Sequence, residues 1–164
     1  MTSLPDNTTS ASSQQPQRSQ VFISYSRKDK RYLDELHTQL SLYVRSGYIN
    51  YWDDTKIRPG AHWREELDQA LNSARVAVLL VSSDFLASNF IIEQELPPLL
   101  AAEKRQETKI ISVILDYCAY KLTELAKIQT MNDPAQPLGS ISKLQRKQVW
   151  LKVAEEVKNN LGSV

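Results

Sequence analysis

The chain has 164 residues, 41% hydrophobic and 24% charged, which indicates one packed domain rather than a disordered polypeptide. Its 20 lysines and arginines balance 19 acidic residues, which argues against general electrostatic attraction to nucleic acid or membranes. The single cysteine, Cys118, excludes an internal disulfide, and the two isolated histidines give no metal-ligand spacing. We therefore expect a cytoplasmic protein with no metal, no nucleic-acid partner and no membrane partner.

Residues 1–19 are rich in Ser, Thr, Gln and Asn and contain no apolar run, so they lack the hydrophobic segment of a signal peptide. We interpret them as a disordered leader or linker. No stretch approaches the roughly 20 apolar residues that span a bilayer. The folded domain is expected over residues 20–162.

The first predicted strand is the short apolar run at residues 21–25. From Lys30 onward, apolar residues recur three and four positions apart, which predicts a helix with one apolar face that ends at Gly47. A second strand is predicted over residues 48–52, and a charged loop with a Pro-Gly turn follows over residues 53–61.

Trp63 begins the next predicted helix, and the run at residues 76–81 is so continuously apolar that it predicts a central strand covered on both faces. The serines and aspartate at residues 82–84 suit a helix start, and the helix that follows is expected to kink near Pro97 and Pro98. Residues 109–115 give a fourth strand.

Residues 116–140 carry the weakest pattern, although a short fifth strand is predicted near Ile128. Ser142 and Gln145 match a capping box, which predicts the start of a C-terminal helix. Strand and helix thus alternate, and the fold class is α/β: an open parallel five-stranded sheet with helices on both faces.

This architecture predicts which residues are buried in the sheet and at which edge of the sheet a ligand binds. Val78, Leu80, Ile111 and Val113 lie in apolar runs and are expected to be buried in the sheet. Open α/β sheets bind ligands outside the carboxyl ends of their strands, where the strand order switches. The functional residues are therefore expected in the loops after the first three strands.

Three segments resemble the Toll/interleukin-1 receptor (TIR) domain family. VFISYSRKDKRYLDEL is similar to the family's first box, in which an apolar strand runs into a Ser-Tyr-Ser and charged turn. YWDDTKIRPGAHWREEL resembles its second strand and the long loop that follows. VAVLLVSSDFLASNFIIEQEL is similar to its third strand, the double serine, and the helix that carries a glutamate in enzymatic members.

The resemblance is greatest to the prokaryotic, enzyme-like branch, and it implies a flavodoxin-like fold and NAD⁺ glycohydrolase activity. Such an enzyme releases nicotinamide and forms ADP-ribose or a cyclic ADP-ribose isomer, here in bacterial defence or signalling. The chain has only four glycines and no glycine-rich dinucleotide fingerprint, so NAD⁺ would be a consumed substrate and not a bound cofactor. The family also implies self-association through contacts between TIR domains.

The catalytic carboxylate implied by the resemblance is Glu95, with Glu93 as second choice. The related pattern Ser-x-Trp-Cys-x-x-Glu, counted without a gap from Ser88, ends on Gln94, whereas Glu95 precedes Leu96 as in the common Glu-Leu ending. Helical geometry does not decide between the glutamates, because they flank the apolar stripe on opposite sides.

The residues expected to bind substrate combine aromatic rings, hydroxyls and charges in the loops after the strands. Ring faces can stack on a base, an arginine can bind pyrophosphate, and carboxylates can contact ribose hydroxyls. Core packing, turn formation and ordinary solvated charges are the structural alternatives at these positions. The set is Tyr25, Ser26, Arg27, Trp52, Asp53, Asp54, Arg58, Trp63, Ser83 and Phe85, and Ser24 shares the place of the first three.

Two other functions remain open at this point. One is a non-catalytic interaction module that assembles signalling complexes through contacts between TIR domains. The other is a sensor that binds NAD⁺ or a derivative without cleaving it.

Overall fold

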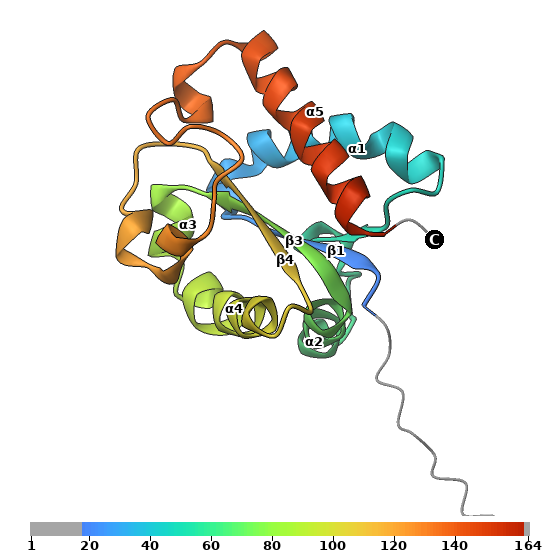
Figure 1. Ribbon diagram of the computed structural model, residues 1–164. Helices are drawn as coiled ribbons and strands as arrows, with labels where there is room; N and C mark the ends of the chain where they lie inside the picture. The colour runs from blue at the N-terminus through green and yellow to red at the C-terminus, as the bar shows by residue number, and fades with distance from the viewer. Residues whose placement is uncertain (1–17, 163–164) are drawn as a thin grey trace, which may run out of the picture.

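A computed structural model describes residues 18–162. Its sheet has four parallel strands in the order β2-β1-β3-β4. The strands are β1 (Gln20–Ser24), β2 (Tyr51–Trp52), β3 (Ala74–Val81) and β4 (Lys109–Ile114). The α-helices are α1 (Lys30–Arg45), α2 (Trp63–Ser73), α3 (Ser83–Ala87), α4 (Leu96–Lys104) and α5 (Lys143–Asn160). The expected α/β architecture is therefore present (Figure 1).

Short turns of other helix types join these elements. A π-helical turn spans Ile91–Glu95 and leads directly into α4. The 3₁₀ turns are Arg27–Asp29, Asp54–Lys56, Tyr120–Leu122, Glu124–Lys127 and Leu138–Ser140. No helix within residues 18–162 is long and apolar enough to cross a membrane.

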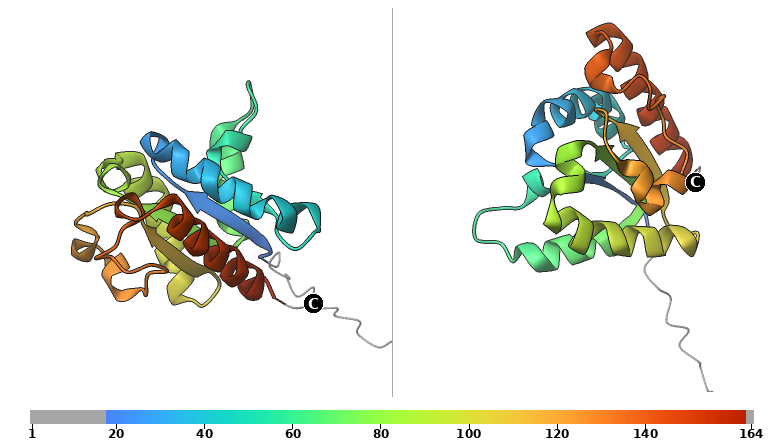
Figure 2. Two further views of the ribbon diagram at one scale, coloured as in Figure 1. Left: turned by 90° about the horizontal axis from the view of Figure 1, so that it is seen from above. Right: turned by 90° about the vertical axis from the view of Figure 1, so that its left-hand side faces the viewer.

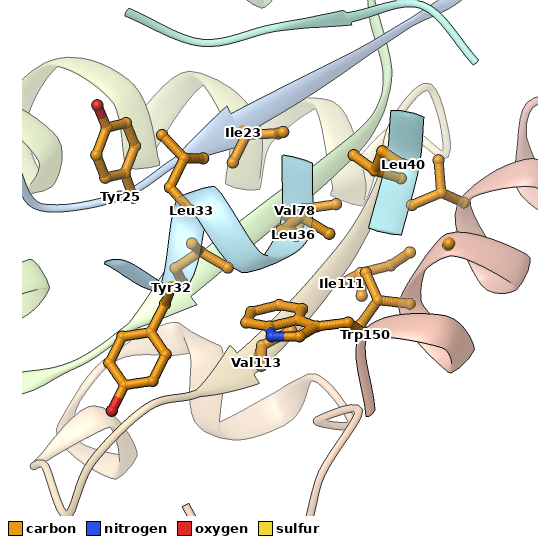
Figure 3. Packing of buried hydrophobic residues seen from close by; sticks show 14 of the residues in the cluster. Ile23, Tyr25, Tyr32, Leu33, Leu36, Leu40, Val78, Ile111, Val113 and Trp150 are labelled. Atoms are coloured by element: carbon orange, nitrogen blue, oxygen red, sulfur yellow. The ribbon is translucent and has the colours of Figure 1, made fainter. Parts of the chain in front are cut away.

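Helices cover both faces of the sheet, as Figures 1 and 2 show. α1 and α5 pack on one face, where their buried residues form a cluster with side chains of β1, β3 and β4 (Figure 3). α2, α3 and α4 cover the other face. The predicted buried residues Val78, Leu80, Ile111 and Val113 are each no more than 2% exposed, so that prediction is confirmed.

The predicted fifth strand is wrong. Residues 120–127 form two 3₁₀ turns, and beyond them only the isolated parallel bridge between Ser112 and Thr130 continues the sheet. The Asn132 carboxamide bonds to both backbone groups of Ile114, accepting from its N–H at 2.8 Å and donating to its carbonyl at 2.9 Å. A side chain thus takes the place of a strand backbone, and Pro134, which has no N–H, cannot extend the pairing.

The second strand is shorter than the predicted 48–52. Tyr48 and Ile49 both direct their N–H groups to the carbonyl of Tyr43, at 2.9 and 3.3 Å, and so complete the end of α1. Gly47, at φ +80°, makes that reversal possible and confirms the predicted helix end. Only Tyr51 and Trp52 remain to pair with β1.

Side-chain hydrogen bonds fix the chain before β1 and at the start of α5. Residues 1–17, most of the predicted leader, lie outside the described residues. Arg18 donates to the carbonyl of Leu71 at 2.9 Å and pairs with Glu107 at 3.2 Å, which anchors the chain before β1. The predicted capping box of Ser142 and Gln145 is present at the start of α5.

Candidate active site

A cavity of about 910 Å³ opens at the carboxyl ends of β1 and β2. The chain runs from β1 to β2 on one side of β1 and then crosses to β3 on the other side, so this end of β1 is the switch in strand order, the usual binding position. Residues 53–62, between β2 and α2, project from the body of the domain beside it (Figure 2). The cavity collects eight of the expected residues: Tyr25, Ser26, Arg27, Trp52, Asp54, Arg58, Trp63 and Glu95.

Glu95 is a buried carboxyl group at the wall of this cavity. Its side chain comes from the π-helical turn, and the residue is only 7% exposed. Oε1 accepts a hydrogen bond of 2.7 Å from the Ser24 hydroxyl. Burial raises the pKa of Glu95 to about 7, although the Ser24 hydrogen bond opposes the shift, and the charge of Asp54 raises the pKa further.

The π-helical turn explains which residue of this helix faces the cavity. Pro97 and Pro98 lack N–H groups, and their rings would clash with the carbonyls four residues earlier in an α-helix. The turn widens instead, and the N–H of Leu96 bonds to the carbonyl of Ile91, five residues back. A π turn holds one residue more than an α turn, which matches the one-residue excess of this chain over the related motif.

The neighbours of Glu95 point elsewhere. Glu93 is exposed to solvent and does not line the cavity. Gln94 accepts a hydrogen bond of 2.7 Å from Arg64 of α2 on the exposed surface. Of the three candidate positions in this turn, only Glu95 reaches the cavity.

Asp54 organises the polar side of the cavity. It accepts a hydrogen bond of 2.6 Å from the Tyr25 hydroxyl and a longer one of 3.4 Å from Arg27. Burial and the hydrogen bond to Asp54 raise the pKa of Tyr25 far above its usual range, so the phenol remains a donor. The Arg27 side chain is 88% exposed, and its guanidinium remains accessible to an anionic ligand.

Aromatic rings form the apolar part of the site. The Trp52 ring stacks on Phe22, with ring centroids 5.3 Å apart, and Trp52 also lines the cavity. Trp63 is 50% exposed at the rim, and its centroid lies 6.0 Å from that of Phe90. These half-exposed rings offer faces on which a planar base can stack.

A TIR domain family model matches residues 21–138, which is more than half of the chain. The chain belongs to the TIR domain family. This TIR domain is 29% identical over 144 residues to y4lF of Sinorhizobium fredii, an uncharacterized protein. The match covers 88% of this chain but only 44% of that protein's length.

Two solved structures share the fold. One is the TIR domain of the Toll-related receptor TRR-2 from Hydra magnipapillata, with TM-score 0.57, 17% identity, and coverage of 85% of this chain and 98% of that one. The other is the TIR domain part of the activated Roq1 resistosome, which recognises the effector XopQ, with TM-score 0.52, 20% identity, and coverage of 85% and 83%. Both support the α/β architecture of the TIR domain described above.

Asp53 lies outside the cavity lining of this TIR domain, although Asp54 beside it lies within. Asp53 is fully buried on the side of α1, where His37 donates to it at 2.7 Å. The N–H of Thr55 also donates to it, at 3.0 Å, so Asp53 caps the 3₁₀ turn Asp54–Lys56. Burial opposes ionisation, but these hydrogen bonds outweigh it and lower the pKa of Asp53.

Ser83 and Phe85 also lie outside the cavity lining. Phe85 is completely buried in the core under the sheet. The N–H of Ser83 donates to Asp116, which follows β4, at 3.0 Å. The preceding residue, Ser82, caps α3 by accepting from the N–H of Phe85 at 2.9 Å. The double serine therefore shapes the start of a helix.

Sequence reasoning missed several residues of the cavity. Phe90 occupies the place of the tryptophan in the related motif, so the motif itself could have identified it. Lys28 follows Arg27 directly and is a third cation of the cavity, beside Arg27 and Arg58. Ser88 begins the same motif, whereas Ile23, Ile57, Pro59, Leu67 and Ile91 carry no chemical signal in the sequence.

Proposed function

We propose that this TIR domain cleaves the nicotinamide–ribose bond of NAD⁺, as the prokaryotic NAD-cleaving members that it resembles do. The observation that carries the proposal is a buried carboxylate, Glu95, at the wall of a large cavity with aromatic rings and cations around it. Nicotinamide leaves as a neutral molecule from a cationic precursor, so no general acid is required. One carboxylate suffices to stabilise the positive charge that develops on the ribose.

The bond changes of this reaction balance without a cofactor. The C–N bond between the ribose and nicotinamide breaks, and its electron pair leaves with nicotinamide. Water then attacks the same ribose carbon and loses a proton to solvent, which gives ADP-ribose. Attack by an atom of the adenosine part instead gives a cyclic isomer.

The other residues of the cavity have matching roles in this proposal. Trp63 and Phe90 can stack on a base of the dinucleotide at the rim. Arg27, Lys28 and Arg58 line the cavity and can bind the pyrophosphate. Asp54 can accept a hydrogen bond from a ribose hydroxyl in addition to the one from Tyr25.

The first experiment is to incubate the purified protein with NAD⁺ and to measure free nicotinamide and ADP-ribose by chromatography. We expect both products to form, and we expect the specific activity to fall on dilution, because TIR domains assemble and the projecting loop can complete a neighbour's cavity. An intact NAD⁺ pool at high protein concentration would contradict the proposal, and if NAD⁺ also did not bind, the result would favour the non-catalytic interaction module. Binding without cleavage would favour the sensor.

The pH dependence of kcat/KM is expected to follow Glu95. Burial raises its pKa to about 7, and the reaction requires the charged form, so kcat/KM should rise as the pH increases through about 7 and then level off. The cation of bound NAD⁺ favours the charged carboxylate, so kcat should rise at a lower pH. Steady-state kinetics over a pH series measures both profiles, and a kcat/KM that is flat from about pH 5 to about pH 9 would contradict the role of Glu95.

A further inference from the structure

Ser24 is a buried hydroxyl at the switch in strand order. It is the last residue of β1, pairs with Leu79 of the neighbouring strand, and is 1% exposed. Side chains alternate along a strand, so Ser24 faces the same side as Phe22, the side covered by α2, α3 and α4. A buried hydroxyl there requires a hydrogen-bond partner, and that partner is Glu95, 71 residues further along the chain.

The two oxygens of Glu95 have different surroundings. Oε1 accepts the 2.7 Å hydrogen bond from Ser24. Oε2 has no hydrogen-bond partner within residues 18–162, although the residue as a whole lines the cavity. A ligand that enters the cavity therefore meets Oε2 as the free acceptor.

We propose that Ser24 is a positioning residue, whose hydroxyl holds the Glu95 carboxylate by Oε1 and leaves Oε2 free for the ribose. The proposal rests on the function proposed above for Glu95. A carboxylate on a helical side chain has three rotatable bonds, and a single fixed oxygen removes most of that freedom. The catalytic oxygen is thereby held in place before the substrate arrives.

The hydrogen bond also affects the charge of Glu95. Burial and the nearby Asp54 raise the pKa of Glu95, and the Ser24 hydroxyl lowers it. Asp54 is itself paired with Tyr25 and Arg27, which lie beside it in the cavity. The remaining charged groups around the site are Lys28 and Arg58 in the cavity wall, Arg64 bonded to Gln94, and the exposed Glu93.

The test is a carbon-13 NMR titration of the glutamate carboxyl groups, in which the Glu95 signal is assigned by its loss in Glu95→Gln. The wild-type signal should titrate near pH 7, and Ser24→Ala should titrate about one pH unit higher, because the charged form loses its donor. Ser24→Thr keeps the hydroxyl and should restore the wild-type midpoint. Ser112→Ala is the matched control, since Ser112 is a fully buried serine of β4 whose hydroxyl has no partner in the described chain.

Kinetics adds a second readout that a purely structural role would not move. In Ser24→Ala, the rise of kcat/KM should shift to higher pH together with the titration, and kcat above the midpoint should fall on the order of tenfold to a hundredfold with little change in KM. If Ser24→Ala does not fold, Ser24→Cys has a similar size and a weaker donor, and its midpoint should also rise.

The proposal would be overturned if the Glu95 titration midpoint were unchanged in Ser24→Ala and Ser24→Cys. It would also be overturned if Ser24→Ala kept the wild-type value of kcat at pH values above the midpoint. The NMR titration does not depend on NAD⁺ cleavage. If the protein does not cleave NAD⁺, the proposed function fails, and the titration still decides whether Ser24 holds Glu95.

Discussion

Glu95→Gln is expected to lower kcat for NAD⁺ cleavage on the order of 10²–10³-fold, with little change in KM. Glutamine keeps the shape of the side chain and can still accept the hydrogen bond from Ser24 through its amide oxygen. It lacks the negative charge that stabilises the ribosyl cation, and this interaction matters most in the transition state. The measurement is the rate of nicotinamide release at saturating NAD⁺ and at a pH above 7.

Glu93→Gln is the matched control for this experiment, because it makes the same change on an exposed residue of the same turn. It should keep wild-type kcat. If Glu93→Gln abolished the activity and Glu95→Gln did not, the assignment of the carboxylate would be wrong, while the mechanism would survive. If neither change affected a protein that cleaves NAD⁺, the carboxylate mechanism would have to be abandoned.

The same substitution is expected to stabilise the fold at alkaline pH. The pKa of Glu95 is raised from 4.5 to about 7, so between these values the folded protein keeps a proton that the unfolded chain releases. Wild-type stability therefore falls as the pH rises through this window, and above it the buried charge costs about 3 kcal/mol. Glutamine is neutral at every pH and avoids this cost.

Thermal or urea unfolding of wild type and Glu95→Gln at several pH values measures the effect. The difference in free energy of unfolding should be near zero at about pH 4 and should approach about 3 kcal/mol in favour of Glu95→Gln at about pH 8. In a domain of this size, that difference raises Tm by several degrees. A pH-independent difference for Glu95→Gln would contradict the burial of a titrating carboxyl group.

A variant that is both more stable and less active is the expected signature of a functional carboxylate. Most substitutions of buried residues destabilise a protein, because they leave cavities or unpaired groups. Glu95 instead places a charge where the fold alone would prefer a neutral group. Selection for chemistry at this position would account for the lower free energy of unfolding of the wild type.

The amino-acid sequence determined the local elements of this TIR domain. The continuous apolar run at residues 76–81 became the inner strand β3, and the capping box of Ser142 and Gln145 started α5, because the pattern that predicts each of them lies in adjacent residues. Eight of the expected site residues line one cavity, since parallel strands bring their carboxyl ends to one edge, whereas Asp53, Ser83 and Phe85 lie outside it. The prediction of a fifth strand was wrong, because hydrogen bonds from the Asn132 side chain to Ile114 of β4 take the place of backbone pairing.

Tertiary structure decided how the side chains at that edge are used. Asp53 and Asp54 are chemically identical neighbours, yet one is buried against His37 and the other faces the cavity, and no local pattern distinguishes them. The π turn decides that Glu95, and not Glu93 or Gln94, faces the cavity. The pKa of Glu95 depends on burial among elements distant in the sequence. Sequence periodicity reports which face of an element is apolar, whereas a hydrogen bond across 71 residues and a shifted pKa exist only after the elements have packed.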